Sequence, residues 1–481
     1  MFVPQALSLR PHPRFLLGYL LHKLATLIIV TANLSLGICH VFADNLGDKP
    51  CRPNIVLILA DDLGWRDVPW HGCDYEMPNL DKLAKESLLL DAHYGHPMCS
   101  PTRAALLSGR YASRFGCTGA QNERVYPFET ITLAAALKSV GYTTAITGKW
   151  HLGSMPEWGP NLFGFDHSYG SLAGGVGPYD HHYKKGPFTE TWHRNCERIQ
   201  EEGHVTDLIA AEAVRFVERK HEAPFFLYVP FTAVHIPIDE PEEWLAKNTH
   251  ITDPGDRLHA ASATHMDAAI GQILTAVERV GKRDDTIVLF FSDNGGHGPT
   301  QNFDAKYPGN YPRQRVGRDN APLRGLKSSV WEGGVRSAAL INWRGKLKPG
   351  KLDAPLAACD WMPTFTKLVG YAPPRDLRWD GIDAWPALSG AADDGNPRTV
   401  YSSGVRGRES MIRRGPWKLI VSPQGAPQLY NVVEDIGETA DRASSEPEIV
   451  ADLQRRFTEV TARDDESKVK PDPASKSQAG E

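Results

Sequence analysis

The 481-residue chain has few cysteines, no block of basic residues and a single N-glycosylation sequon. Its seven cysteines match neither the spacing of a zinc ribbon nor that of a small disulfide scaffold, so we expect at most one or two disulfides. The net charge is −5 and the lysines and arginines are scattered, which argues against nucleic acid as a partner. An anionic substrate therefore has to be held by a local group of basic residues.

The first 43 residues differ in composition from the rest of the chain. Arg10 and Arg14 precede an apolar run over 24–38 and a small-residue pattern that ends at Ala43. This pattern predicts a signal peptide over 1–43, and hence a secreted or periplasmic protein with no stable membrane anchor after cleavage. An uncleaved anchor is the alternative, but the apolar run is short for a membrane span. The single sequon, at Asn33, falls inside this leader and favours a bacterial protein.

Short apolar segments alternate with helical patterns through most of the chain. A stripe of apolar residues over 258–280, ended by Gly281, predicts one of the helices. Strands that are apolar throughout and separated by helices predict a large, mostly parallel sheet sandwiched by helices, an α/β fold. The strand candidates are residues 54–60, 142–147, 225–230, 286–291 and 335–342.

From residue 396 onward the pattern changes. Four short strand candidates follow one another without helices, which predicts a smaller antiparallel sheet, closed by a helix over 446–461. We expect one large domain over 52–395 and a small C-terminal α+β subdomain over 396–463. The last stretch, 464–481, has almost no apolar residues and is expected to be disordered.

Acidic and amide side chains follow two of the apolar segments directly. Asp61 and Asp62 come after 54–60, and Asp293 and Asn294 come after 286–291. Ligands of open α/β sheets bind beyond the carboxyl ends of the strands, so we expect these residues to converge. Hard oxygen donors, three of them anionic, favour Ca²⁺ or Mg²⁺ over Zn²⁺. Each pair taken alone is also typical of a helix cap or a turn.

Basic residues follow two other segments. Lys149 and His151 come after 142–147, and His235 comes after 225–230. Together with Lys327 they supply positive charge and transferable protons. Any one of them alone is more often a solvated lysine or an ordinary hydrogen-bonded histidine, so only the joint pattern is informative.

The segment HPMCSPTRAALLSGRY, residues 96–111, places Cys99 where a helix begins. Ser100 suits the N-cap, Pro101 suits the first helical position, and Gly109 ends the helical pattern. Because helix N-termini attract anions, this segment predicts a negatively charged substrate near Cys99. The alternative is a buried, inert cysteine before a capped helix.

Taken together, these motifs resemble the sulfatase family, whose members hydrolyse sulfate esters. The similarity is to formylglycine-dependent type I sulfatases of the arylsulfatase and N-acetylgalactosamine-sulfatase kind, and it implies an alkaline-phosphatase-like fold with the catalytic domain over 52–395. The matching segments are ADDLGW (60–65), CSPTR (99–103), LLSGRY (106–111), GYTTAITGKWHLG (141–153), SDNG (292–295), LRGLKSSVWEGGVR (323–336) and LYNVVEDIGETAD (429–441).

The resemblance implies that a separate formylglycine-generating enzyme oxidises Cys99 to formylglycine, an aldehyde whose hydrated gem-diol form is the nucleophile. It also implies one Ca²⁺ ion beside this residue. The implied ligands are Asp61, Asp62, Asp293, Asn294 and residue 99 itself.

The resemblance also implies roles for the basic residues. Arg103 and Lys149 hold and polarise residue 99, and His151 forms a hydrogen bond with it. Lys149, His235 and Lys327 bind the sulfate oxygens. The leaving alcohol needs a proton, for which His235 is the first candidate and Lys327 the second.

The implied substrate is a sulfated carbohydrate or a glycosaminoglycan fragment. The segment 174–195 is rich in aromatic, histidine and basic residues, which suits stacking on sugar rings and holding acidic groups. We expect Asp180, His181, Tyr183 and His193 to contact the substrate, although an ordinary exposed loop has the same composition.

Two other functions fit parts of the pattern. A phosphomonoesterase or phosphodiesterase of the alkaline-phosphatase-like superfamily normally has a serine or threonine nucleophile and ligands for a second metal, so Cys99 within CSPTR argues against it. A cysteine phosphatase has C-x₅-R, and Ala105 occupies the arginine position. A non-catalytic binder of sulfated glycans is the other alternative, and the intact motifs argue against it.

Overall fold

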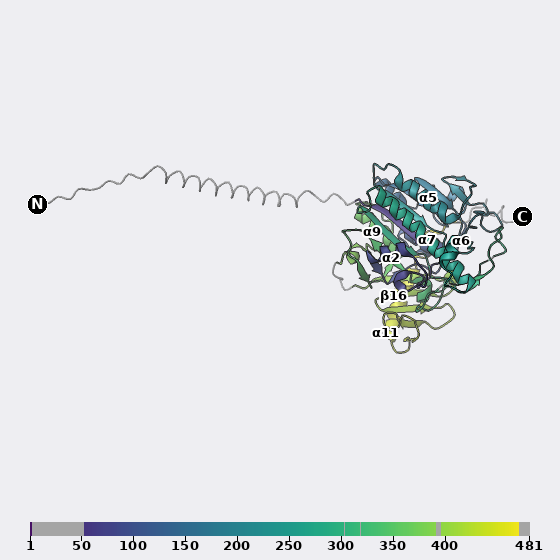
Figure 1. Cartoon of the computed structure of the whole chain (residues 1–481). Coiled ribbons are helices and arrows are strands. Elements are labelled where there is room, and N and C mark those ends of the chain that lie inside the picture. Colours follow the sequence, from purple (N-terminus) through teal and green to yellow (C-terminus); the bar gives the residue numbers. More distant parts are fainter. Residues whose placement is uncertain (2–51, 303, 318, 391–395, 471–481) are drawn as a thin grey trace. The chain divides into compact units, whose positions relative to one another are not determined.

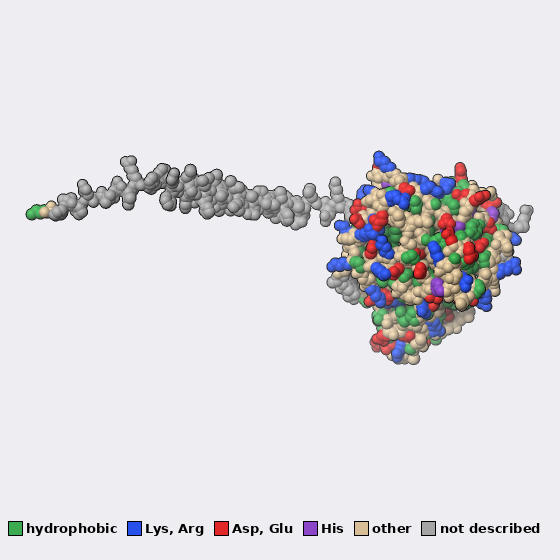
Figure 2. Space-filling view, viewed as in Figure 1, with side chains coloured by type: hydrophobic (Ala, Val, Ile, Leu, Met, Phe, Trp, Pro, Cys, Tyr) green, Lys and Arg blue, Asp and Glu red, His purple; other side chains and the backbone are tan. Residues whose placement is uncertain are grey.

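The structure is a computed structural model that describes residues 1, 52–302, 304–317, 319–390 and 396–470. The predicted signal peptide lies outside the described residues, apart from Met1. Within the described ranges, no helix combines the length and the apolar character needed to cross a bilayer. Figure 2 shows positive and negative side chains interspersed over the face that it draws.

A ten-stranded mixed sheet forms the centre of the molecule (Figure 1). Its middle strands run parallel, and antiparallel strands join at both sides. In order across the sheet, the strands are β13 (Gly350–Leu352), β2 (Leu88–Leu90), β12 (Ala339–Asn342), β9 (Thr286–Ser292), β1 (Asn54–Ala60), β8 (Phe225–Pro230), β4 (Thr143–Thr147), β5 (His167–Ser171), β6 (Trp192–Arg194) and β7 (Glu197–Arg198).

The register of the parallel strands aligns their carboxyl ends. Ala60 at the end of β1 lies opposite Ser292 at the end of β9, and Leu59 lies opposite Pro230 at the end of β8. Because the next residues leave the sheet at the same level, Asp61 and Asp293 reach one edge together. The predicted strand over 335–342 is shorter than expected, since residues 332–335 form helix α8 (Glu332–Val335) and β12 begins at Ala339.

Helices cover both faces of the sheet, as its alternating side chains require. Ile55, Leu57 and Leu59 of β1 belong to one hydrophobic core, and Val56 and Ile58 belong to the other. The first core is covered by α3 (Cys99–Ser108), α4 (Leu133–Ser139) and α9 (Trp361–Leu368). The second is covered by α2 (Pro78–Lys85), α5 (Val205–Glu218) and α7 (Pro254–Arg279).

The helix predicted over 258–280 is α7, and it begins earlier than expected. The Asp253 side chain accepts hydrogen bonds from the backbone N–H groups of Gly255 and Asp256, so this N-cap starts the helix at Pro254. The helix ends before Gly281, whose φ of 67° lies in the left-handed region.

The remaining short elements connect these layers. The helices are α6 (Glu242–Lys247) and α10 (Trp385–Leu388), and the 3₁₀ helices are Pro69–His71, Ala112–Phe115, Pro156–Trp158, Pro160–Phe163, Ala358–Asp360 and Val405–Gly407. Two small ribbons pair β3 (His93–Tyr94) with β14 (Leu356–Ala357) and β10 (Thr300–Gln301) with β11 (Arg315–Val316).

The C-terminal part contains the small antiparallel sheet and the helix that the sequence predicts. Its four strands are consecutive: β15 (Thr399–Ser402), β16 (Ser410–Arg414), β17 (Trp417–Val421) and β18 (Gln428–Asn431). Helix α11 (Pro447–Thr461) packs on them through Leu453. The fold class is therefore confirmed: a large mixed, mostly parallel sheet with helices, followed by a small antiparallel sheet.

The predicted disordered tail differs in its first residues. Residues 464–470 form turns against the segment 110–116. Asp464 accepts a hydrogen bond of 2.7 Å from buried Arg114, and Glu466 forms an ion pair with Arg110. These charged contacts hold a segment that has no apolar core of its own. Residues 471–481 lie outside the described part.

A buried lysine joins the small sheet to the large one. Lys418 of β17 is fully buried, and its Nζ lies 2.9 Å from Glu332 Oε1 and 2.8 Å from Glu438 Oε1. Glu332 belongs to α8, in the segment that also carries Lys327. The ion pair therefore links the C-terminal sheet to the site edge of the large sheet.

We predict that Lys418→Met destabilises the protein by about 3 kcal/mol or more, because Glu438 loses its buried cation and Glu332 keeps only Arg336, at 3.3 Å. The matched control is Lys351→Met. The Lys351 side chain is 56% exposed and forms its ion pairs at the surface, so its loss should cost about 1 kcal/mol or less. Denaturant unfolding of the two variants and the wild type measures both values. Equal losses would contradict a linking role for Lys418.

Candidate active site

The carboxyl ends of the parallel strands bring distant residues into one buried cluster. Lys149 Nζ donates to Asp61 Oδ2 at 2.5 Å, and Asn294 Nδ2 donates to Asp62 Oδ1 at 2.8 Å. The Asp62 N–H donates to Asp293 Oδ1 at 3.3 Å. All five side chains are fully buried. The convergence predicted from the strand ends is therefore present.

Helix α3 delivers Cys99 to this cluster, although its capping differs from the prediction. The helix begins at Cys99 with Met98 as N-cap, so Pro101 is its third residue instead of its first. The Ser100 hydroxyl instead accepts a hydrogen bond from the N–H of Gln121 at 3.2 Å. Gly109, with φ 70°, ends the helix as predicted. The earlier start places the Cys99 side chain at the first turn, facing the carboxylates.

The Cys99 thiol is enclosed by polar groups. Its Sγ lies 3.3 Å from His151 Nδ1 and within 4.8 Å of carboxylate oxygens of Asp61 and Asp293. The side chain is 1% exposed, and burial raises the pKa of the thiol. The protein therefore encloses an uncharged thiol in a site built for ions.

Arg103, one helical turn after Cys99, connects three segments. Its Nη2 and Nε donate to Asp293 Oδ2 at 2.7 and 3.2 Å, and its Nη1 donates to the Lys149 carbonyl at 2.7 Å. The guanidinium is fully buried. Because one side chain holds both the end of β9 and the turn after β4, Arg103 fixes Lys149 relative to the carboxylates.

The carboxylates of the cluster titrate in opposite directions. Burial raises the pKa of Asp61 to about 7, an effect that Asp293 and Asp62 increase and Lys149 opposes. Burial also acts on Asp62, but the charges of Lys327, His235 and His297 outweigh it and hold that pKa below its usual value. Lys327 Nζ donates to Asp62 at 2.7 Å. The cluster therefore has too little positive charge near Asp61 to stabilise its ionised carboxylate fully.

Two acceptor atoms of the cluster indicate where a cation fits. Asp61 Oδ1 and Asn294 Oδ1 are buried, and neither has a hydrogen-bond partner among the described residues. A buried acceptor without a partner is costly, and a divalent cation would satisfy both oxygens at once. The backbone of Asp62 has a φ of 64°, in the left-handed region, which is a strained conformation typical of functional sites. The donor set therefore fits a divalent metal.

A pocket of about 460 Å³ opens beside the cluster. Burial lowers the pKa of the His235 imidazole, and the charge of Lys327 lowers it further; His235 Nε2 lies 3.8 Å from Asp62 Oδ2. Burial also lowers the pKa of His151, which lies deeper, beside Cys99. The lining residues are Asp62, Lys184, His235, Ile236, His297, Gly298, Pro299, Thr300, Asp304, Tyr307 and Lys327.

Sequence reasoning missed five polar residues of this pocket: Lys184, His297, Thr300, Asp304 and Tyr307. His297 Nε2 lies 3.8 Å from Asp62 Oδ2, and its place just after the SDNG motif was a usable signal. Lys184 lies in the segment that we singled out for sugar contacts, but it was not chosen. Asp304 and Tyr307 come from a loop without any motif, so only the structure reveals them.

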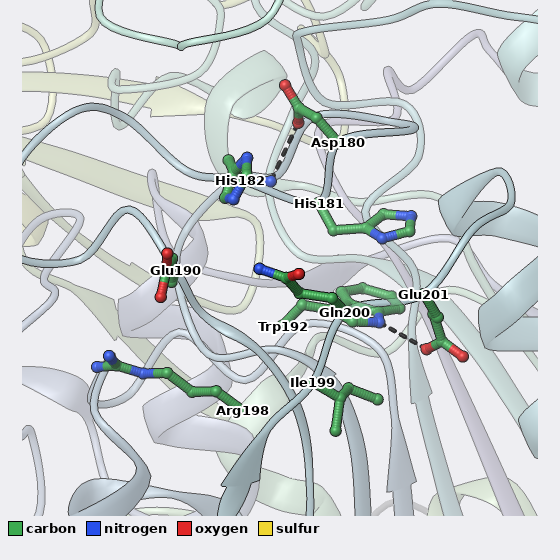
Figure 3. Close-up of a pocket in the computed structure, with 9 residues that line it drawn as sticks. All are labelled: Asp180, His181, His182, Glu190, Trp192, Arg198, Ile199, Gln200 and Glu201. Carbon is green, nitrogen blue, oxygen red and sulfur yellow. Dashed lines mark hydrogen bonds between the residues drawn. The ribbon is translucent and has the colours of Figure 1, made fainter.

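The four residues expected to contact a sugar are placed differently from one another. Asp180 and His181 line a second pocket of about 470 Å³, where they project from one loop near Trp192 (Figure 3). The Tyr183 ring packs edge to face on Tyr307 at 5.7 Å. His193 is buried, and its ring nitrogens lie 2.7 Å from the Gly170 carbonyl and 3.1 Å from Ser168 Oγ. The structure thus packs Tyr183 against Tyr307, which lines the pocket beside the cluster, and leaves His193 inside the sheet.

Comparison with known proteins gives one consistent result. A family model described as Sulfatase matches residues 53–371. Arylsulfatase J of Mus musculus is 29% identical over 472 residues, covering 85% of this chain and 75% of that protein. N-acetylgalactosamine-6-sulfatase of Rattus norvegicus is 33% identical over 364 residues, covering 70% of this chain and 66% of that protein.

Solved structures share the architecture. The crystal structure of Ps i-CgsB in complex with k-i-k-neocarrahexaose has a TM-score of 0.77 and 30% identity, covering 89% of this chain and 96% of that chain. The phosphonate monoester hydrolase of Agrobacterium radiobacter has a TM-score of 0.60 and 18% identity, covering 86% of this chain and 96% of that chain. The second similarity is one of fold alone.

A second cluster of titratable residues centres on His265 of α7. Its Nδ1 lies 2.8 Å from Glu240 Oε2 and its Nε2 lies 3.0 Å from Asp207 Oδ1. The Trp244 ring stacks on it at 4.6 Å, and the tilted His204 ring lies 4.7 Å away. Burial lowers the pKa of His265, but the two carboxylates outweigh it and raise that pKa to about 9. The ring is therefore a buried imidazolium that joins α7 to α5.

We predict that His265→Gln destabilises the protein most at acidic and neutral pH. The pKa in the folded state exceeds that of an unfolded histidine, so the stabilisation is complete below about pH 6.5 and is lost as the pH rises through 9. The penalty of the variant should fall by about 3 kcal/mol between pH 6 and pH 10. Unfolding free energies of the wild type and the variant at both pH values measure it.

The control is His250→Gln, because His250 is exposed and its ring forms a hydrogen bond with the exposed segment at the Asp74 carbonyl, without an ion pair among the described residues. Its penalty should stay small at both pH values. A penalty of His265→Gln that does not change with pH would contradict a charged His265.

Proposed function

This chain belongs to the sulfatase family, and we propose that it hydrolyses the sulfate monoester of a sulfated carbohydrate with Cys99 in its formylglycine form, beside one Ca²⁺ ion. Family membership makes the chain a sulfuric ester hydrolase. The finer proposal rests on one observation: a fully buried, charge-balanced cluster encloses Cys99 and contains two acceptor oxygens without partners among the described residues.

The Ca²⁺ assignment is supported by the chemistry of the donor atoms. Asp61, Asp62, Asp293 and Asn294 offer oxygen atoms only, and Ca²⁺ is a hard cation that takes six to eight oxygen ligands. Asp61 Oδ1 and Asn294 Oδ1 are the atoms that lack any other partner among the described residues. When bound, the ion supplies Lewis-acid stabilisation of negative charge.

The formylglycine assignment is supported by the surroundings of Cys99. The hydrated aldehyde supplies an oxygen nucleophile and a second hydroxyl at this position. His151 Nδ1 lies 3.3 Å from Cys99 Sγ, within reach to exchange a proton with an atom at that place. Because Arg103 donates to the Lys149 carbonyl, Lys149 stays on the same side of the site as residue 99. There the Lys149 ammonium group can hold the sulfate oxygens.

We assign binding of the sulfate ester and release of the alcohol to the residues of the cluster that border the pocket. Lys149, His235 and Lys327 form the wall that holds the sulfate, with the two lysines as its cations. His235 is the first candidate for the proton donor to the leaving alcohol, because 18% of its side chain is exposed and it borders the pocket. Lys327 is the second candidate, since its ammonium group lies at the same wall.

The carbohydrate assignment is supported by the relatives. N-acetylgalactosamine-6-sulfatase is named for a sulfated amino sugar, and Ps i-CgsB was solved with k-i-k-neocarrahexaose. The pocket beside the cluster, at about 460 Å³, is in the range that small ligands occupy. The proposed export through a signal peptide agrees with an extracellular polysaccharide as the source of substrate.

The first test concerns residue 99. In protein produced together with a formylglycine-generating enzyme, mass spectrometry should find the residue-99 peptide with sulfur replaced by oxygen and two hydrogens fewer. Such protein should hydrolyse an aryl sulfate at least 100-fold faster than the matching aryl phosphate, and Cys99→Ala should lose at least 1,000-fold in kcat/KM, on the order of removing a nucleophile.

Cys196→Ala is the control for this test, because Cys196 is exposed and lies outside the cluster. It should keep the wild-type activity. An active preparation in which residue 99 remains a thiol would refute the proposed nucleophile.

The second test removes the metal. A chelator should lower the melting temperature of the purified protein, and Ca²⁺ should restore it; saturation at 100 times Kd stabilises a protein by about 2.7 kcal/mol. Asn294→Leu should abolish or strongly reduce this response, whereas Asn248→Leu, at another buried asparagine, should retain it. An equal response in both variants would place the ion elsewhere.

A further inference from the structure

Tyr307 carries a buried hydroxyl that borders the active-site pocket. The residue is 3% exposed, and its hydroxyl oxygen has no hydrogen-bond partner among the described residues. A Cβ atom on Gly175 would lie 2.2 Å from this oxygen and 3.6 Å from Cε1 of His235, so the hydroxyl and the imidazole border the same space. Because an unpartnered buried hydroxyl is costly, this position indicates that a ligand supplies the missing partner.

A charged pair stands beside Tyr307 at the rim of the same pocket. Lys184 Nζ and Asp304 Oδ2 are 2.7 Å apart, with side chains 34% and 31% exposed. The two loops that carry them are held together, because the Lys185 N–H donates to the Lys306 carbonyl at 2.6 Å. The rim therefore presents an ammonium group, a carboxylate and a hydroxyl in fixed positions.

We propose that Tyr307, Lys184 and Asp304 form the subsite for the sugar ring that carries the sulfate, and that this subsite selects a ring whose other substituents are neutral. The proposal rests on the proposed function and specifies its substrate. An adjacent carboxylate and ammonium group pair well with neighbouring sugar hydroxyls, since one accepts a hydrogen bond and the other donates one. The Tyr307 hydroxyl completes the set.

The charges around the pocket explain the selection against a second anionic group. Of the described residues that line it, the lysines are Lys184 and Lys327, and each already contacts a carboxylate, Asp304 or Asp62. A second sulfate or a carboxylate on the ring would meet the charge of Asp304 and would have to separate Lys184 from it. A single sulfate, in contrast, enters the wall at His235 and Lys327 and leaves the Lys184–Asp304 pair intact.

The test compares three substrates: galactosides that carry one sulfate, the same rings with a second sulfate, and 4-nitrophenyl sulfate, which has no sugar. The wild type should prefer its best monosulfated ring over the disulfated ring by at least tenfold in kcat/KM. Tyr307→Phe should lose about tenfold more on the monosulfated sugar than on 4-nitrophenyl sulfate, because only the sugar offers a partner to the hydroxyl.

Asp304→Asn tests the charge argument separately. It should reduce the preference for the monosulfated ring at least fivefold, since it removes the repelling carboxylate. Asp353→Asn, which removes an equal charge from a side chain 77% exposed and outside the lining of the pocket, should leave the preference unchanged.

Three outcomes would overturn the subsite while sulfate ester hydrolysis remains. They are equal losses of Tyr307→Phe on the sugar and on 4-nitrophenyl sulfate, an unchanged preference in Asp304→Asn, and a wild type that accepts disulfated rings equally well. Absence of any sulfate ester turnover in formylglycine-containing protein would instead overturn the proposed function, and the subsite with it.

Discussion

The active site depends on the pairing of three buried carboxylates with three buried or nearly buried cations. Neither set can be buried without the other, because the desolvation of isolated charges is too costly. The pairs also determine position: they hold the ends of β1 and β9, the turn after β4 and the segment 323–336 in one arrangement. The six residues are Asp61, Asp62, Asp293, Arg103, Lys149 and Lys327. Because their formal charges cancel, an added divalent ion makes the centre cationic, as a sulfate monoester requires.

Much of the sheet and of its polar edge could be predicted from the sequence because the signals are local. The apolar segment 54–60 is β1 without change, and the polar residues that follow it are placed by strand direction alone. The cluster formed by Asp61, Asp293 and Cys99 follows from this rule and from the resemblance to a known family. Residues whose position follows from the end of a strand could therefore be predicted from the sequence.

Residues whose position depends on packing between distant segments could not be predicted from the sequence. The Ser100 side chain bonds to Gln121 instead of capping α3, and the sequence contains no trace of that preference. Asp304 and Tyr307 lie on a loop that becomes part of the pocket only when it meets the segment around Lys184. His193 looked suitable for a ligand by composition, yet its ring nitrogens contact Gly170 and Ser168 within the sheet. Composition indicates which groups a segment has, but not which way they face.

The contacts of residues 464–470 with the segment 110–116 bear on the order of events during synthesis. Arg114, a short distance beyond α3, is also paired with Asp380, but its contact with Asp464 forms only after nearly the whole polypeptide has left the ribosome. That flank of the molecule, beyond the C-terminal end of α3, therefore closes last, whereas Cys99 lies at the opposite end of the helix.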